Sequence, residues 1–303
     1  DLELQLSAVS AFVHLPLGQR IPSSPHAVSC SLPTMRDVRG YEEKNPETMR
    51  AVVSGYPRFV VHPFARQLSA HLIATTAALA GRTLWLVTSA RMARALAAHL
   101  NHTTAGSRAE IAVQAGADVF LRDHIHGVSH STDAATYTRA KTFLQNIGGF
   151  ISSREAEDHL VRLGLLAAPH PETVFASDAP DGSAARIRQI LRPALPDCRD
   201  SDLLLAPSGM NAIYAAFRAS AAIQAARGRT LWLQLGWLYI DTIAVLKKFT
   251  STPDDYVYIR DPLDLDGIAR IFQNHGKRIA GVFAELPTNP LIQTPDISAL
   301  AVL

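Results

Sequence analysis

The sequence has few cysteines, no long apolar run and no signal-peptide pattern. Its two cysteines, Cys30 and Cys198, lie far apart without Cys-x-x-Cys spacing, which fits neither a disulfide framework nor a zinc cluster and is typical of the reducing cytosol. The longest apolar stretch, from Leu68 to Gly81, is interrupted by His71 and is shorter than the ~18 residues of a membrane span. No charged segment followed by an apolar one indicates a signal peptide. We therefore expect a cytoplasmic protein that does not engage a membrane.

The sequence also lacks an excess of charge of either sign. Lys and Arg number 29 against 27 Asp and Glu, a formal net charge of +2, and the basic residues are scattered. Nucleic-acid binding requires a concentrated positive surface, so no nucleic-acid partner is expected. Hydrophobic residues make up 48% and charged residues 18% of the 303 residues. These fractions exclude a disordered, coiled-coil or collagen-like chain and predict a globular protein of one large or two medium domains.

Several motifs with known chemistry are absent as well. The sequence has no Gly-x-Gly-x-x-Gly and no Gly-x-x-x-x-Gly-Lys-Ser/Thr, so neither a dinucleotide site nor a P-loop is predicted. His124, His126 and His130 offer ring nitrogens to a metal, but no carboxylate or cysteine accompanies them at helical spacing, which favours a polar loop and no metal site. Ser208-Gly209 lacks the glycine two residues before the serine that a nucleophile elbow requires.

Residues 1–63 differ from the rest of the chain in their proline content. Prolines recur from Pro16 to Pro63, which excludes a long helix or a central strand. We predict an extended N-terminal arm with short turns that wraps over a neighbouring domain or subunit, with a floppy terminus as the alternative. The apolar and aromatic run from Tyr56 to Val61 favours docking.

Residues 64–200 are predicted to form an α/β segment and a connector. Apolar spacing indicates helices at 68–80, 91–100 and 135–147, a buried strand at 83–87 and further strand within 109–120. Prolines and a glycine in 166–200 indicate a connector with one short helix near 184–191.

Residues 201–303 alternate more regularly. A short apolar run at 203–205 is taken as a strand before a helix that starts at Ser208-Gly209, has Ile213, Phe217 and Ile223 on its apolar face and stops at Gly228. Such alternation predicts βαβ units and a parallel sheet covered on both faces. The sequence Gly-Arg-Thr-Leu-Trp-Leu occurs at both 81–86 and 228–233, which we interpret as two similar junctions rather than a duplication. The elements expected after Gly228 are strands at 230–235, 256–259 and 279–283 and helices at 242–249 and 265–275.

Four short segments are candidates for chemistry. Ser208-Gly209-Met210 opens a helix, where free backbone N–H groups and the helix dipole bind phosphate. Tyr239 follows a predicted strand at its carboxyl end, where an aromatic ring can stack on a flat heterocycle. Asn289 lies in a proline-bounded loop after another strand and offers an amide. Tyr56-Pro57-Arg58 supplies a hydroxyl and a guanidinium suited to phosphate.

Taken in their order along the chain, these segments resemble the Cys/Met-metabolism family of pyridoxal-phosphate (PLP) enzymes. The stretches from Pro25 to Thr34 and from Gln234 to Tyr239 are similar to the fungal-type cystathionine γ-synthase branch specifically. The resemblance is strong over 25–63 and 202–298 and looser between them. The matching segments are Tyr56-Pro57-Arg58, Ser208-Gly209-Met210, Leu238-Tyr239-Ile240-Asp241-Thr242 and Glu285-Leu286-Pro287-Thr288-Asn289-Pro290.

The resemblance implies a fold, a cofactor and a set of site residues. The implied fold is the α/β, mostly parallel fold type I of PLP-dependent transferases, with 201–303 as the first part of the large PLP-binding domain and 64–200 as a branch-specific segment. The implied assembly is a homodimer or homotetramer with shared active sites. Tyr56 and Tyr239 are the candidate catalytic residues. In the implied site, Tyr56 and Arg58 reach the phosphate of the neighbouring subunit's cofactor, Ser208, Gly209 and Met210 hold the phosphate, Tyr239 stacks on the ring and Asn289 lies near the ring oxygen.

The implied reaction is γ-replacement on a small amino-acid substrate. An O-acylhomoserine reacts with cysteine to give cystathionine, a step of transsulfuration and methionine biosynthesis. Other reactions of the family, γ-elimination and O-acylhomoserine sulfhydrylation, share these motifs. A non-catalytic PLP-fold subunit and an unrelated doubly wound α/β domain are the alternatives from other classes.

The sequence departs from the family pattern in two places. Ile240-Asp241 stands where most members have Gly-Gly. The chain also stops at Leu303, before the family's aspartate that pairs the pyridine nitrogen and before its Ser-x-x-Lys segment, and Lys247, Lys248 and Lys277 match neither position. The expectation is therefore a fold that is incomplete at its C-terminus, and no turnover by these 303 residues alone.

Overall fold

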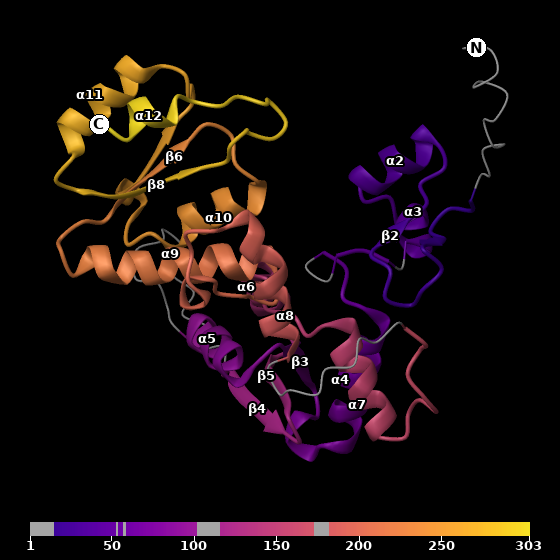
Figure 1. Ribbon diagram of the computed structural model, residues 1–303. Coiled ribbons are helices and arrows are strands. Elements are labelled where there is room, and N and C mark those ends of the chain that lie inside the picture. Colours follow the sequence, from indigo (N-terminus) through magenta and orange to yellow (C-terminus); the bar gives the residue numbers. More distant parts are fainter. Residues whose placement is uncertain (1–14, 53, 57–58, 102–115, 173–181) are drawn as a thin grey trace, which may run out of the picture. The chain divides into compact units, whose positions relative to one another are not determined.

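The structure is a computed structural model in which residues 15–52, 54–56, 59–101, 116–172 and 182–303 are described. The chain is mixed α/β and divides into two compact units (Figure 1). The first unit comprises residues 1–140 and 150–173, and the second comprises residues 141–149 and 174–303. Among the described helices, none is both long enough and apolar enough to cross a membrane.

An antiparallel sheet with the strand order β3-β5-β4 forms the centre of the first unit. Strand β5 (Ile125–Ser131) pairs with β3 (Arg82–Val87) along one edge and with β4 (Asp118–Arg122) along the other. Asp123 and His124 join β4 to β5 with φ values of 48° and 66°, the two positive values of a type I′ turn. This sheet differs from the parallel sheet predicted for residues 201–303, because a two-residue turn can connect only antiparallel strands.

Strand β5 also corrects the predicted polar loop at residues 124–130. His130 is fully buried within this strand, and its Nε2 accepts a hydrogen bond of 2.9 Å from Nε1 of Trp85. Its Nδ1 donates to the carbonyl oxygen of Ser131, 2.7 Å away. Both ring nitrogens are therefore used inside the sheet. No group of residues in the described part of the chain could hold a metal ion.

Helices pack against this sheet and bury its leucines. Helices α4 (Pro63–Thr75) and α7 (Ser153–Arg162) pack on each other, and α5 (Ala90–Asn101) packs on β5. The predicted helix at 91–100 and the strand at 83–87 are confirmed, as is the helix at 135–147, which is α6 (Ala134–Ile147). The sequence analysis missed α7. The core shared by these elements contains Leu68, Leu72, Leu79, Leu84, Leu86, Ile125, Ile151 and Leu160.

The segment predicted as an extended arm contains two short helices. Helix α2 (Met35–Glu42) begins after Thr34, whose side chain forms a capping box, and α3 (Pro46–Ala51) has proline at its first position. Proline excludes long helices but suits a first turn, because its missing N–H group has no intrahelical partner there. Two-residue strands β1 (Arg20–Ile21) and β2 (Ser29–Cys30) pair antiparallel beside these helices. Proline content thus predicted the absence of long helices but missed short ones.

A parallel sheet with the strand order β7-β6-β8 forms the centre of the second unit. Strand β6 (Leu231–Leu235) is central and pairs with β7 (Tyr256–Ile259) and β8 (Ile279–Ala284). Because all three strands run in one direction, their carboxyl ends meet at one edge of the sheet. The predicted parallel sheet is confirmed for this unit.

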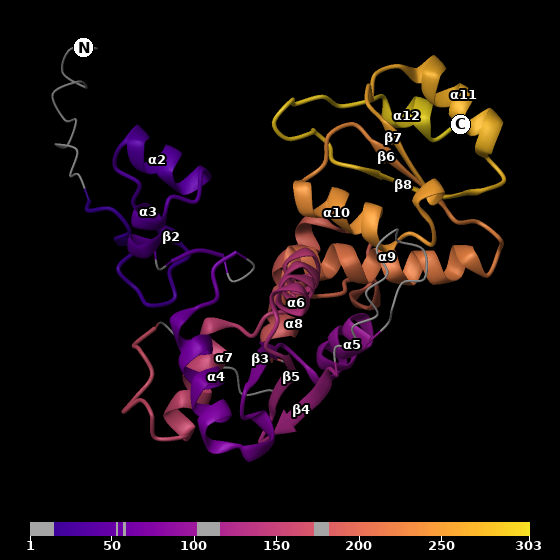
Figure 2. The same ribbon diagram turned by 180° about the vertical axis from the view of Figure 1, so that it is seen from behind.

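Helices cover both faces of this parallel sheet (Figures 1 and 2). On one face, α9 (Gly209–Ala225) and α10 (Ile240–Phe249) bury Phe217 and Val245 against Trp232. On the other face, α11 (Leu265–His275) buries Ile268 against alternate leucines of β6. The chain ends with helix α12 (Ile297–Leu300).

Two details of the predicted second unit are wrong. Residues 203–205 form no strand; Leu204 is 88% exposed. Ile223 does not belong to the buried face of α9, since it is 54% exposed whereas Phe217 is fully buried. The remaining elements agree with the predictions within a few residues, including α8 (Gly182–Leu191). Short 3-10 helices lie at Ala77–Leu79, Arg192–Ala194, Asp200–Asp202 and Pro253–Asp255.

Candidate functional site

The start of α9 offers backbone N–H groups to a ligand. Ser208 is the N-cap residue, and its Oγ accepts a hydrogen bond of 3.2 Å from the backbone N–H of Asn211. The N–H groups of Gly209 and Met210 belong to the first turn, where no intrahelical acceptor exists. A side chain built on Gly209 would meet no atom within 4 Å, so the space beside it is open. This open space next to free N–H groups and the positive end of the helix fits a phosphate group.

Met210 anchors this helix start in the core. Its side chain is 5% exposed and packs in the same cluster as Phe217, Trp232 and Leu238. The buried Met210 side chain therefore fixes the first turn to the core, while the neighbouring Gly209 faces open space. The motif Ser208-Gly209-Met210 thus combines a cap, an open backbone position and an apolar anchor.

The C-terminal end of α6 lies against the start of α9. Oγ of Ser208 donates to the carbonyl oxygen of Gly148 at 3.5 Å, and the side-chain amide of Asn211 donates to the carbonyl oxygen of Ile147 at 3.4 Å. Gly148 has a φ of +69°, and a Cβ there would collide with Oγ of Ser208. Only glycine allows this backbone to approach Ser208 so closely.

The same end of α6 holds the start of α10. The carboxylate of Asp241, 3% exposed, accepts a hydrogen bond of 3.0 Å from Nδ2 of Asn146. Oδ1 of Asn146 in turn accepts one of 2.8 Å from Nζ of Lys248. Burial lowers the pKa of Lys248, and the charge of Asp241 opposes this change. Residues 146–148 therefore fix the first turns of both α9 and α10, which places Ser208 and Tyr239 around one structural support.

Tyr239 and Asn289 both follow strands at the carboxyl edge of the sheet. Tyr239 is the N-cap residue of α10, is 37% exposed, and donates its backbone N–H to Oε1 of Glu285 at 2.6 Å. Glu285 directly follows β8, so this bond ties the loop after β6 to the loop after β8. The two loops thus converge at the edge where ligands of parallel sheets bind.

Thr288 rigidifies the loop that carries Asn289. Its backbone N–H donates to the carbonyl oxygen of Gln293, its own carbonyl accepts from Ile292, and its Oγ1 accepts from the N–H of Gln293. Thr288 is buried, whereas Asn289 is exposed. The fixed amide predicted for this loop is therefore supported by a buried threonine as well as by the two prolines. The sequence analysis assigned no role to Thr288.

The structure brings together part of the predicted set. Ser208, Gly209, Met210, Tyr239 and Asn289 all belong to the second unit. Tyr56 belongs to the first unit, is 60% exposed, and its carbonyl oxygen accepts hydrogen bonds in a local turn. Arg58 lies outside the described residues. The role of Tyr56 and Arg58 at a neighbouring subunit stays a prediction.

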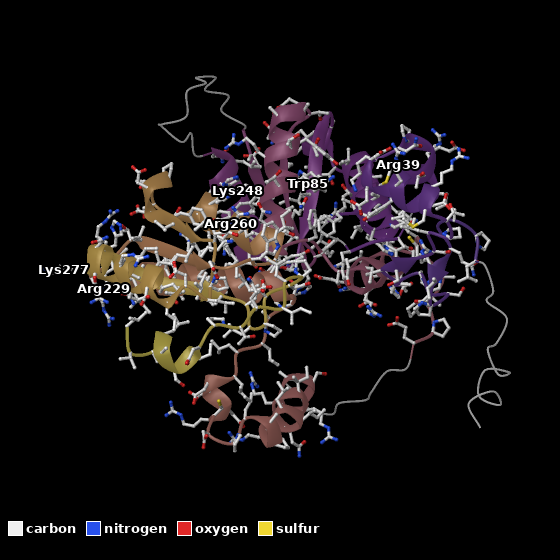
Figure 3. The ribbon with its side chains drawn as sticks, turned by 90° about the horizontal axis from the view of Figure 1, so that it is seen from above. Arg39, Trp85, Arg229, Lys248, Arg260 and Lys277 are labelled. Atoms are coloured by element: carbon white, nitrogen blue, oxygen red, sulfur yellow. The ribbon has the colours of Figure 1, made fainter. Side chains whose placement is uncertain are left out.

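Three lysines of the second unit, Lys247, Lys248 and Lys277, have surroundings that differ from a cofactor site. Lys248 donates to Asn146 as described, and Nζ of Lys247 lies 5.8 Å from the centre of the Tyr256 ring. Lys277 follows the end of α11, at the opposite end of the sheet from Tyr239. Lys248 and Lys277 are labelled in Figure 3. We assign none of the three a bond to a cofactor.

Sequence reasoning missed the residues that support the site. Asn146 and Gly148 lie 60 to 102 residues from their partners, and no local pattern indicates such pairings. Asp241 was noted only as a departure from Gly-Gly, yet it is buried and bonded to Asn146. A carboxylate directly before the predicted helix at 242–249, next to the apolar Ile240, was the available signal, because a buried carboxylate needs a partner.

Comparison with curated proteins finds relatives along most of the chain. A protein of Streptantibioticus cattleyicolor named L-2-amino-4-chloropent-4-enoate dechlorinase/desaturase is 36% identical over 92% of this chain and 52% of the relative. A cystathionine γ-synthase-like enzyme of Amanita muscaria is 27% identical over 95% of this chain and 58% of the relative. The cystathionine γ-synthase of Neurospora crassa is 24% identical over 93% and 62%. Homologues of the chain are thus cystathionine γ-synthase-like enzymes.

The chain spans about half the length of the curated relatives it matches. No family model and no solved structure matches it.

Proposed function

We propose that this chain forms part of a PLP-dependent enzyme of the Cys/Met-metabolism family, with fold type I, that acts on an amino acid carrying a leaving group on its γ-carbon. The observation that carries the proposal is the 36% identity to the dechlorinase/desaturase over 92% of the chain. The substrate in that relative's name has chlorine on carbon 4, which is the γ-carbon of the amino acid. The O-acylhomoserine of cystathionine γ-synthase also loses its leaving group from the γ-carbon. The position of the leaving group is therefore what the two reactions share.

The geometry of the second unit supports this proposal. The N–H groups of Gly209 and Met210, beside open space, would hold the cofactor phosphate. Tyr239 and Asn289 would contact the ring from the loops after β6 and β8. When bound, PLP withdraws electrons from the amino acid, which allows a group to leave from a neighbouring carbon.

Two specific reactions fit this proposal. One is γ-replacement with cysteine to give cystathionine. Removal of the leaving group together with a proton, which adds one carbon–carbon π bond, is the other, and the name of the dechlorinase/desaturase favours it. In the replacement reaction a thiol forms the new bond at the γ-carbon, whereas in the second reaction no nucleophile is added. Detection of the products separates the two.

The experiment compares substrates on the whole enzyme of which this chain is proposed to form part, saturated with PLP. L-2-Amino-4-chloropent-4-enoate and O-acetyl- and O-succinylhomoserine are supplied with and without cysteine, and release of chloride or acid is measured beside cystathionine. We expect release from at least one of these substrates and none from L-homoserine, whose hydroxyl is a poor leaving group. A protein that binds PLP but releases nothing from any γ-substituted amino acid contradicts the proposal.

We further propose that the sites are shared between subunits of a homodimer or homotetramer, with Tyr56 and Arg58 acting on the neighbouring subunit's cofactor. Arg58 suits this role because a guanidinium forms two charge-assisted hydrogen bonds to a phosphate. Subunits changed at Arg58 are mixed with subunits changed at Gly209. Recovery of activity in the mixture supports sharing, and no recovery after subunits have exchanged contradicts it.

A further inference from the structure

A pocket lies at the carboxyl edge of the parallel sheet. It has a volume of about 610 Å³ and is lined by residues that follow or end β6 and β7 and by the loop after Asn289. This volume is in the range of small-molecule sites. The pocket residues differ from Ser208, Gly209, Met210, Tyr239 and Asn289, which the proposed function assigns to the cofactor.

The walls of this pocket are apolar. Trp237 and Tyr258 contribute aromatic rings that are 43% and 41% exposed, and Leu291 contributes an aliphatic side chain that is 57% exposed. Large apolar groups with this exposure lose water when a ligand covers them. The walls therefore favour a ligand with an apolar portion.

The polar groups of the pocket carry both signs of charge. Arg260 has no ion-pair or hydrogen-bond partner among the described residues, and it is labelled in Figure 3. The adjacent Asp261 uses Oδ1 to accept from the N–H of Leu263 at 2.9 Å, which leaves Oδ2 for another donor. A guanidinium and a carboxylate side by side match a ligand that carries a carboxylate and an ammonium.

We propose that this pocket binds a free α-amino acid with an apolar side chain, its carboxylate at Arg260 and its ammonium at Asp261. The pocket is separate from the residues assigned to the cofactor. An amino acid held there keeps both its carboxylate and its ammonium in contact with the protein. Within the proposed function, the ligand would be a second amino acid beside the one that reacts at the cofactor.

The test measures binding rather than turnover, on the full protein with its cofactor content determined separately. L-Methionine is titrated while the tryptophan fluorescence is followed. Trp85 and Trp232 are 5% and 4% exposed, so their emission should stay constant and any change should come from Trp237. We expect a saturable change that the Trp237→Phe variant loses. The deamino acid 4-(methylthio)butanoate and the amine 3-(methylthio)propylamine, each with one of the two charges, should bind more weakly than methionine.

Variants identify the two charges. Arg260→Gln should weaken binding of methionine and of the butanoate roughly 10- to 100-fold, the range for loss of a charged hydrogen bond. Asp261→Asn should weaken methionine and the amine but leave the butanoate unchanged. The matched control is Arg229→Gln, another exposed arginine of the second unit, which should bind all three like the unchanged protein.

Two outcomes would overturn the inference. One is the absence of any saturable Trp237 response, as expected if another part of the protein covers the pocket. The other is equal binding by the Arg260→Gln, Asp261→Asn and unchanged proteins. Failure of the proposed function is seen separately, as absence of PLP from a protein that still binds methionine.

Discussion

Residues 81–86 and 228–233 have the same sequence, Gly-Arg-Thr-Leu-Trp-Leu, and lie in different sheets. In both copies the glycine has a positive φ, +69° and +73°, and a buried strand follows. The two tryptophans are buried to the same degree, with Trp85 5% and Trp232 4% exposed. The local sequence is therefore sufficient for the turn, the strand and the burial.

The surroundings of the two copies differ. Both tryptophan rings pack against two aromatic rings, Trp85 against Tyr137 and Phe150 and Trp232 against Phe217 and Phe283. Trp85 in addition donates a hydrogen bond to His130 on an antiparallel neighbour. His130 is 45 residues from Trp85 in the sequence. Whether the buried indole has a hydrogen-bond partner is thus decided by remote residues, and not by the strand itself.

The largest expected effect is a loss of stability that is equal for the two copies. Trp85→Ala and Trp232→Ala each remove a fully packed indole and should lower the free energy of unfolding of their units by about 3–5 kcal/mol. Denaturant titrations followed by hydrogen exchange of β3 and of β6 measure the two losses. A loss below about 1 kcal/mol in either unit would contradict equal burial of the two rings.

Replacement of each tryptophan by phenylalanine should lower stability by different amounts in the two copies. Trp85→Phe leaves Nε2 of His130 buried without a donor, at an extra cost of about 1–3 kcal/mol, whereas Trp232→Phe loses only packing. The same unfolding measurement applies. Adding His130→Leu to Trp85→Phe removes the unpaired nitrogen and should recover part of the loss. If the two phenylalanine variants lose equal stability, the Trp85–His130 bond contributes nothing.

Mild acid should also lower the stability of the first unit more than that of the second. Burial lowers the pKa of His62, His130 and His159, all in the first unit. The unfolded state then binds more protons than the folded state, so the stability of this unit falls as pH decreases below the ordinary histidine pKa of ~6.5. The second unit contains a single histidine, His275.

In the second unit, Asp255 carries the corresponding acid sensitivity. Its burial raises the carboxyl pKa, but hydrogen bonds from Thr230, Thr252 and Arg278 outweigh this and lower the pKa overall. Its contribution is therefore lost only below the ordinary aspartate pKa of ~3.9. Hydrogen exchange between pH ~7 and ~5.5 should show faster opening of β3 and β5 with β6 and β8 unchanged. Earlier opening of β6 would contradict this order.

The smallest effect concerns the threonines of the repeated sequence. Oγ1 of Thr230 donates to Oδ1 of Asp255 at 2.5 Å, whereas the Thr83 side chain has no hydrogen-bond partner among the described residues. Thr230→Val should cost about 1 kcal/mol, and the matched Thr83→Val change should stay within ~0.5 kcal/mol. Equal melting shifts for the two variants would show that the Asp255 bond adds no stability.

These comparisons indicate what the sequence could and could not predict. Periodicity and turn residues predicted the strands at 83–87 and 230–235 and a parallel sheet in residues 201–303, because these features follow from local sequence patterns. The antiparallel hairpin of β4 with β5 was missed, since Asp123-His124 is not a typical type I′ pair.

The candidate site shows the same division. Ser208-Gly209-Met210 and Tyr239 could be selected as short motifs at element boundaries, and the structure places them at the starts of α9 and α10. Their support by Asn146 and Gly148 depends on contacts across 60 to 95 residues. Such pairings leave no periodic signal in one sequence, so they required the structure.

The most direct test of the account is PLP binding by a Gly209→Asp variant. An aspartate there would enter open space at a helix start, where its charge favours the fold, but it would repel a phosphate. We predict that the unchanged protein and the neutral Gly209→Asn variant bind PLP, that Gly209→Asp binds it about tenfold or more weakly, and that phosphate-free pyridoxal does not distinguish the variants. Equal PLP affinity of Gly209→Asp and the unchanged protein would contradict the assignment of the α9 start as the phosphate site.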